Sequence, residues 1–194
     1  WDYQIAFGAA VLSHFTISVE NKQYLWEQQQ ATILPHNHIV FSDKPKYERY
    51  PHAWKLSLPF LATKIQTEQG VLRLLTAHFH VSYECLETLQ IWQDAERIAE
   101  YVEVTDNTPL IFTGDLNIRN ESMAIKTLSE KMTQQSRDFT NTLTPSIHPV
   151  FQLNHADPLR PIDHIFTKNV SVSSCDIRDV DVSDHLPLVL DFSL

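Results

Sequence analysis

The spacing of apolar residues changes along the chain, and this change limits the possible folds most strongly. Residues 60–80 predict a β-hairpin in which Gly70 forms the tight turn. From Glu84 to Val104, apolar residues recur instead at steps of three and four, which is typical of one face of an amphipathic helix. The residues of that predicted face are Cys85, Leu89, Trp92, Ala95, Ala99 and Val102.

Other apolar runs predict short strands around a second helix. The stretch from Ile5 to Leu12 predicts a buried strand, and Leu110 to Phe112 predicts another. Asn120 or Ser122 is expected to cap a second helix that ends near Met132. Further strands are predicted at residues 33, 38–41, 56–58, 162–167, 170–180 and 188–192. The order of strands, few helices and strands again predicts an α+β sandwich with helices packed outside.

The bulk composition fits a single domain over residues 1–194. The chain has 194 residues, of which 43% are hydrophobic, enough for one sizeable core. Its formal net charge of -9 disfavours broad nucleic-acid binding, although a bound divalent cation could offset the acidic average. Cys85 and Cys175 make no disulfide framework and are compatible with a reducing compartment such as the cytoplasm. No apolar run approaches the roughly 20 residues of a transmembrane segment.

Residues 133–160 are polar and punctuated by proline, which predicts a long loop. Loops of this length are uncommon without a function. Arg137 and His148 in this segment are therefore candidates for shaping specificity.

A short acidic motif, Thr113-Gly114-Asp115-Leu116-Asn117, ends one apolar run. A carboxylate at the end of a buried strand has a rigid mount, so Asp115 could take a proton from water or hold a metal. Asn117 could donate a hydrogen bond to a phosphoryl oxygen as charge develops there. An ordinary turn accounts for the same residues equally well.

Asp163 lies in a predicted apolar strand, where a buried carboxylate needs a partner. We expect that partner to be a histidine, which Asp163 would orient and keep protonated. A structural salt bridge with Arg160 is the alternative. His164 should face away from Asp163 on a strand and is expected to be structural.

A second acidic motif, Ser183-Asp184-His185, opens the last apolar run. An imidazolium at His185 would stabilise negative charge on a phosphate, and Asp184 could bind Mg²⁺, which prefers oxygen ligands. A capped turn before the last strand is the alternative. The two acidic motifs together suggest metal-assisted hydrolysis of a phosphate ester.

His78 and His80 alternate with Phe79, so both are expected on one face of their strand, where one of them could contact a phosphate. A polar pair between strands is the alternative. With His36 and His38, these residues also permit a zinc hydrolase with histidine ligands.

The motifs resemble those of the endonuclease/exonuclease/phosphatase superfamily, in the same order along nearly the whole chain. The matching segments are Gly8-Ala9-Ala10-Val11-Leu12-Ser13, Thr76-Ala77-His78, Gly114-Asp115-Leu116-Asn117, Ile162-Asp163-His164-Ile165-Phe166 and Ser183-Asp184-His185. The resemblance implies a four-layer α/β/β/α sandwich with mostly antiparallel sheets and an active site at one end. It also implies a cofactor, Mg²⁺ or Mn²⁺, and a phosphate-ester substrate: a small molecule, a lipid headgroup or a nucleic acid.

The resemblance further implies a role for each motif residue. Asp115 and Asn117 would position the water and the phosphoryl group. His185 would contact the scissile phosphate and be oriented by Asp163, while His78 would bind another phosphate oxygen. The metal would lie at or near Asp184 and Asp115.

Two elements of the superfamily pattern are absent from this sequence. The pattern has an early strand with an Asn and a Gln-Glu pair that supplies the main metal ligand, both before the segment matched at Gly8, and no such pair precedes Gly8 here. We therefore expect a sandwich that lacks its first strands, with an open sheet edge and weak metal binding. A binding module of the same fold with impaired catalysis is the alternative to an active enzyme.

Overall fold

The computed structural model describes residues 11–24, 59–80, 85, 87–152 and 159–194. Predicted strands at residues 33, 38–41 and 56–58 lie outside these ranges, as does most of the strand predicted at residues 5–12.

The described residues form two sheets, and the larger one contains six strands in the order β1-β2-β3-β4-β6-β5. The strands are β1 (Thr16–Tyr24), β2 (Pro59–Thr67), β3 (Gly70–His78), β4 (Leu110–Asp115), β5 (Thr133–Gln134) and β6 (Asp163–Lys168). The predicted hairpin forms from β2 and β3, with Thr67 opposite Gly70 at its tip. Strands β3 and β4 are parallel, whereas the other neighbours in this sheet are antiparallel.

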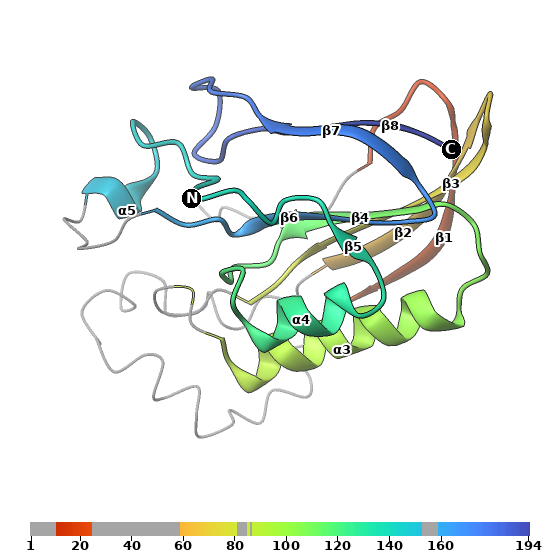
Figure 1. The fold of residues 1–194 in the computed structure, drawn as a ribbon, viewed down its shortest axis with the longest axis horizontal. Coiled ribbons are helices and arrows are strands. Elements are labelled where there is room, and N and C mark those ends of the chain that lie inside the picture. Colours follow the sequence, from red (N-terminus) through yellow and green to blue (C-terminus); the bar gives the residue numbers. More distant parts are fainter. Residues whose placement is uncertain (1–10, 25–58, 81–84, 86, 153–158) are drawn as a thin grey trace, which may run out of the picture.

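The smaller sheet and the helices lie on opposite sides of the larger sheet, as Figure 1 shows. Strands β7 (Ser171–Ile177) and β8 (Leu188–Ser193) pair antiparallel on one side. Helices α3 (Leu89–Val104) and α4 (Met123–Ser129) cover the other side, and α5 (Pro149–Gln152) is a single turn. The predicted α+β sandwich with mostly antiparallel sheets is thus confirmed, and the described residues form its helix, sheet and sheet layers.

Alternation along β4 builds both sides of the core. Leu110 and Phe112 are fully buried against the helices, and Phe112 stacks on Phe166 of β6 with ring centroids 6.0 Å apart. Ile111, between them, points into the second cluster, which packs against hydrophobic residues of β7 and β8. Each such side chain contributes about 1.5–3 kcal/mol by leaving water. Because β4 is buried on both faces, its sequence is a continuous apolar run and not an alternating one.

Helix α3 confirms the predicted helix, and Ala95, Ala99 and Val102 of the predicted face are buried, but the N-terminal part of that face was placed wrongly. Thr88 caps the N-terminus, and Leu89 in the first turn is 46% exposed. Cys85 precedes the helix, with a left-handed φ of 57°. The buried residues are Gln90, Ile91, Asp94, Ala95, Ile98, Ala99 and Val102. The prediction omitted the apolar Ile91 and Ile98 as well as the two polar side chains, Gln90 and Asp94.

The segment after β4 is more regular than predicted. Ser122, and not Asn120, caps α4, because the Ser122 hydroxyl accepts a hydrogen bond from the Ile125 N–H at 3.2 Å. The helix ends at Ser129, before the predicted end at Met132. The predicted loop at 133–160 contains β5 and α5 as well as turns. Strand β1 was not predicted at all.

Gly114 permits the close pairing of β3 and β4. A Cβ atom at this position would lie 1.9 Å from the carbonyl oxygen of Ala77 on the neighbouring strand. Any side chain would therefore separate the two strands. Glycine here keeps the end of β4, with Asp115, against the end of β3.

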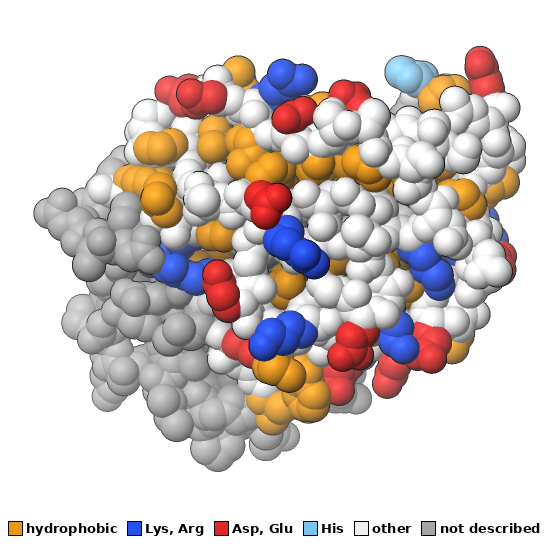
Figure 2. All heavy atoms as spheres, in the orientation of Figure 1, with side chains coloured by type: hydrophobic (Ala, Val, Ile, Leu, Met, Phe, Trp, Pro, Cys, Tyr) orange, Lys and Arg blue, Asp and Glu red, His pale blue; other side chains and the backbone are white. Residues whose placement is uncertain are grey.

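On the face that Figure 2 shows, neither positive nor negative charge dominates, because basic and acidic side chains are interspersed. Among the described residues, no helix is long and apolar enough to cross a membrane.

Candidate active site

Three strands of the larger sheet bring three predicted site residues side by side. In the register of the sheet, His78 at the end of β3 is opposite Asp115 at the end of β4, and Asp115 is opposite Asp163 at the start of β6. The Nε2 atom of His78 lies 3.6 Å from Oδ2 of Asp115. The sheet itself therefore fixes the spacing of these side chains.

Asp163 and His185 form a close pair. Nδ1 of His185 lies 2.8 Å from Oδ2 of Asp163, and the hydroxyl of Thr142 donates to the same oxygen at 2.6 Å. Arg160, the alternative partner of Asp163, instead donates through Nη1 to Sγ of Cys85 at 3.3 Å. With Nδ1 held by Asp163, Nε2 of His185 faces Asp115, 3.9 Å from Oδ2.

The charges around His185 favour its protonated form. Burial lowers the pKa of His185, but the hydrogen bond and charge of Asp163, with the charges of Asp115 and Asp184, raise it to about 9. At neutral pH the site therefore presents an imidazolium that is oriented by a carboxylate. Such a group can stabilise negative charge on a bound anion.

The surroundings of Asp115 favour its neutral, protonated form. Burial, followed by the charge of Asp163, raises the pKa of Asp115 above its usual range, while His185 and the backbone N–H of Asn117 oppose the shift. A carboxylate with a raised pKa is a better proton acceptor at neutral pH. Asp115 is thus suited to take a proton from an attacking water.

Asn117 holds the turn after β4. Its φ is 53°, its N–H donates to Oδ1 of Asp115 at 2.9 Å, and its side-chain Nδ2 donates to the carbonyl oxygen of Phe79 at 3.0 Å. The residue is 5% exposed. The amide therefore ties the ends of β3 and β4 together, and its nitrogen carries a second hydrogen for another acceptor.

Asp184 and His185 are placed by backbone pairing with the segment that follows β5. The N–H of Thr144 donates to the carbonyl of Asp184 at 2.9 Å, and Leu143 forms an isolated bridge with His185. The Asp184 side chain is exposed and close enough to act on Asp115 through its charge. Asp115 and Asp184 offer carboxylate oxygens, so the donor chemistry fits a hard cation such as Mg²⁺ or Mn²⁺.

The two strand histidines have different partners. Burial lowers the pKa of His78, and the charge of His185 lowers it further, so His78 faces Asp115 as a neutral ring near pH 7. His80 lies beyond the end of β3, where its Nδ1 is 3.1 Å from Oδ2 of the buried Asp94 in α3. The histidines thus do not act as one pair. His36 and His38, the other members of the zinc alternative, lie outside the described residues.

His164 points away from the site into the core, as predicted. It is 1% exposed, and Nε2 lies 2.9 Å from the carbonyl oxygen of Ile118. Nδ1 faces the Gln134 amide nitrogen at 3.4 Å and the Ser136 hydroxyl at 3.5 Å. Burial lowers the pKa of His164 to about 4, although the Ile118 carbonyl opposes the shift. The ring is a neutral structural group.

Because this buried ring is neutral, the stability of the folded chain depends on pH. The pKa of His164 is lower in the folded chain than its ordinary 6.5, so its contribution is complete above that value and is lost as the pH falls toward 4. Between about pH 7.5 and about pH 5, we expect a loss of about 2 kcal/mol from this group. Urea unfolding at both pH values measures it, with His164→Gln as the control. Equal pH sensitivity in parent and variant would show that His164 is not responsible.

Thr142 was not predicted from the sequence. Besides donating to Asp163, its hydroxyl accepts the N–H groups of Ile162 and Asp163, each at 3.1 Å. Thr142 thus holds the start of β6 and fixes the carboxylate that orients His185. A threonine in a polar segment carries no signal of such a role, because its partners are 20 or 21 residues away.

Comparison with solved structures shows the same fold in several proteins. An endonuclease/exonuclease/phosphatase from Bacteroides vulgatus aligns over 92% of this chain and 66% of its own, with a TM-score of 0.58 and 19% identity. TDP2 from D. rerio, solved with a single-strand DNA product, aligns over 92% and 69%, with a TM-score of 0.57 and 11% identity. A mannosyl-6-phosphatase from Bacteroides thetaiotaomicron aligns over 71% and 57%, with a TM-score of 0.53 and 17% identity.

The chain therefore spans about two thirds or less of several of these relatives. No curated protein matches it in sequence. A sequence profile of the Endonuclease/Exonuclease/phosphatase family matches residues 2–185, which includes every site residue described above. The chain belongs to the endonuclease/exonuclease/phosphatase family.

Proposed function

We propose that this chain forms the hydrolytic centre of a phosphoesterase that depends on a divalent cation. One observation carries the proposal: the Asp163–His185 pair presents Nε2 of an imidazolium toward Asp115, at the ends of three paired strands. A cationic ring and a carboxylate of raised pKa face each other across one site. The carboxylate can accept a proton from an attacking water, and the ring can stabilise negative charge that develops on a phosphate ester.

In this proposal each residue has a separate task. His185 donates from Nε2 to an oxygen of the scissile phosphate, and Asp163 holds the ring in that orientation. Asp115 accepts a proton from the attacking water, while the oxygen of that water bonds to phosphorus. The ester P–O bond breaks on the opposite side, and the leaving oxygen takes up a proton from solvent to give an alcohol.

Asn117 and His78 complete the phosphate site. Asn117 lies two residues beyond Asp115, and its amide has a hydrogen available in addition to the one donated to Phe79. We assign it to positioning the phosphoryl group. His78, 3.6 Å from Asp115, would contact a second phosphate oxygen.

The carboxylates of Asp115 and Asp184 would hold Mg²⁺ or Mn²⁺. When bound, the cation would stabilise negative charge that develops on the phosphate. The excess of acidic groups supports this assignment, because Asp115, Asp163 and Asp184 all act on the single His185. A bound cation would offset the repulsion among these three carboxylates.

The substrate is proposed at the level of class. Related folds include a mannosyl-6-phosphatase and TDP2 solved with DNA, so the shared element is a phosphate ester. The net charge of -9 favours a small phosphate ester or a lipid headgroup over a long nucleic acid.

Hydrolysis of two chromogenic esters tests the proposal. The protein carrying this chain should release p-nitrophenol from bis(p-nitrophenyl) phosphate or from p-nitrophenyl phosphate when Mg²⁺ or Mn²⁺ is present. Removal of divalent cations with EDTA should abolish the reaction, and re-addition should restore it. Turnover that resists EDTA would contradict the role of the cation. Phosphate binding without any turnover would favour the binding module.

A further inference from the structure

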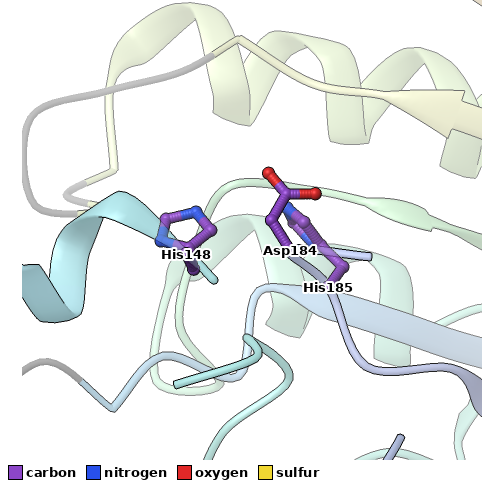
Figure 3. A group of neighbouring side chains, drawn as sticks. All are labelled: His148, Asp184 and His185. Carbon is purple, nitrogen blue, oxygen red and sulfur yellow. The ribbon is translucent and has the colours of Figure 1, made fainter. Parts of the chain in front are cut away.

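A second group of ligand-type side chains shares His185 and Asp184 with the proposed catalytic site. His148, Asp184 and His185 each present one nitrogen or carboxylate oxygen, and these atoms all lie within 4.8 Å of one another. Figure 3 shows the ring of His148 next to the Asp184 carboxylate and the His185 ring. His148 immediately precedes α5, whereas the other two residues precede β8.

Backbone hydrogen bonds hold this group together. The N–H of His148 donates to the carbonyl of Thr144 at 2.8 Å, and the N–H of Thr144 donates to the carbonyl of Asp184 at 2.9 Å. The N–H of Leu186 donates to the carbonyl of Thr142 at 2.8 Å, which continues the pairing past His185. The group is thus built on two segments that are tied together on both sides.

The orientation of His185 suits metal binding. A histidine ligand commonly donates its other N–H to a carboxylate, which fixes the ring with one nitrogen toward the metal. Asp163 holds Nδ1 of His185 in this way, at 2.8 Å, and leaves Nε2 for a ligand.

The spacing of the two rings also suits one ion. The rings of His148 and His185 meet edge-on, at 76°, with centroids 5.6 Å apart. Two imidazoles that bind one tetrahedral ion at about 2 Å place their centroids about 5.2 Å apart. A shift of a few tenths of an ångström would bring the rings to that distance, and the exposed Asp184 can turn to meet the ion.

We propose that His148, Asp184 and His185 form an inhibitory site for a borderline transition-metal ion, with Zn²⁺ as the best fit. Two imidazoles and one carboxylate suit Zn²⁺, whereas Mg²⁺ prefers oxygen ligands alone. Zinc at this site would be coordinated by Nε2 of His185 and by the carboxylate of Asp184, so that neither group could act in hydrolysis. The inhibitory effect rests on the proposed function, since both residues are assigned to it, but zinc binding does not.

The first test measures binding without any turnover. Metal-free protein is titrated with Zn²⁺ by calorimetry and with Co²⁺ by visible absorption, which reports on coordination geometry. His148→Ala should weaken Zn²⁺ binding by about tenfold or more, at least the loss seen when a supporting group of a ligand is removed. His148→Phe keeps a ring against His185 and should show the same loss. His14→Ala, which removes an exposed histidine elsewhere, should bind as the parent does.

Unchanged zinc affinity in both His148 variants would overturn the proposal, and so would an octahedral Co²⁺ spectrum in the parent. A second test adds Zn²⁺ to the Mg²⁺-supported hydrolysis. Zinc should inhibit the parent, and His148→Ala should need about tenfold more zinc for the same fractional inhibition, with each protein compared with its own rate in the absence of zinc. If the parent shows no hydrolysis, but zinc binds it more tightly than it binds His148→Ala, the proposed function fails and the zinc site stands.

Discussion

Replacement of His185 by alanine is expected to lower kcat by roughly 10²–10⁴-fold, the range for loss of a positioned proton donor. The reason is the environment of the ring. Asp163, Asp115 and Asp184 raise the pKa of His185 to about 9, so the parent holds a cation at the proposed phosphate site over the neutral range. Alanine removes the charge and leaves Asp163 with the Thr142 hydroxyl but without its cationic partner.

The kinetics separate this role from a structural one. His185→Ala should lower kcat far more than it changes KM, because the stabilised charge is greatest in the transition state. In the parent, activity should fall as the pH rises through about 9, since the ring then loses its proton. His14→Ala provides the control for a general effect of losing a histidine. Parent-like turnover in folded His185→Ala would refute the assignment.

Replacement of Asp115 by asparagine is expected to abolish most activity without weakening the fold. Asparagine has the same shape but can neither accept a proton from water nor balance a cation, so a loss in kcat of roughly 10³-fold is expected. The free energy of unfolding, in contrast, should stay the same or increase. The pKa of Asp115 is raised, so its charged form destabilises the folded chain as the pH rises above the ordinary value of 3.8.

Paired measurements of kcat and Tm test this second prediction. At about pH 7.5, Asp115→Asn should have an equal or higher Tm than the parent, the usual trade between activity and stability at a strained site. Asp106→Asn is the matched control, because Asp106 pairs with Arg73 at 3.0 Å and its pKa is lowered. That control should keep full activity and gain no stability. A large fall in Tm for Asp115→Asn would mean that the carboxylate is structural.

The ends of strands were the part of the site that the sequence could predict. Asp115 follows a continuous apolar run, and that pattern indicates a strand buried on both faces whose end carries the motif. Sheet register could not be predicted, because it depends on pairing between distant segments. Only the structure shows that His78, Asp115 and Asp163 are direct neighbours across three strands.

Buried polar groups account for the main errors in the fold. Gln90 and Asp94 lie on the buried face of α3, where Gln90 donates to Asp94 at 3.0 Å and Asp94 pairs with His80. A pattern of apolar residues cannot place that face correctly when such pairs replace hydrophobic contacts. Strand β1 was missed for a related reason: it is a mostly polar strand at the edge of the sheet formed by the described residues, and although Ile17 packs against the core, Val19 is 64% exposed.

Side chains that act through long-range contacts were also beyond the reach of sequence reasoning. Thr142 reaches Asp163 across 21 positions, and no local pattern distinguishes it from other threonines. His148 was assigned to a loop that shapes specificity, but its position against His185 arises from backbone pairing of residues 142–144 with residues 184–186, and from the hydrogen bond that the His148 N–H donates to the carbonyl of Thr144.

A double-mutant cycle between Asp163 and His185 tests the central claim most directly. The rate of Mg²⁺-supported phosphodiester hydrolysis is measured for the parent, Asp163→Asn, His185→Ala and the double variant. If the two residues act as one unit, each single change lowers kcat strongly and the double variant is little worse than His185→Ala alone. Losses that simply multiply, or single variants that retain the parent rate, would contradict a hydrolytic centre built on this pair.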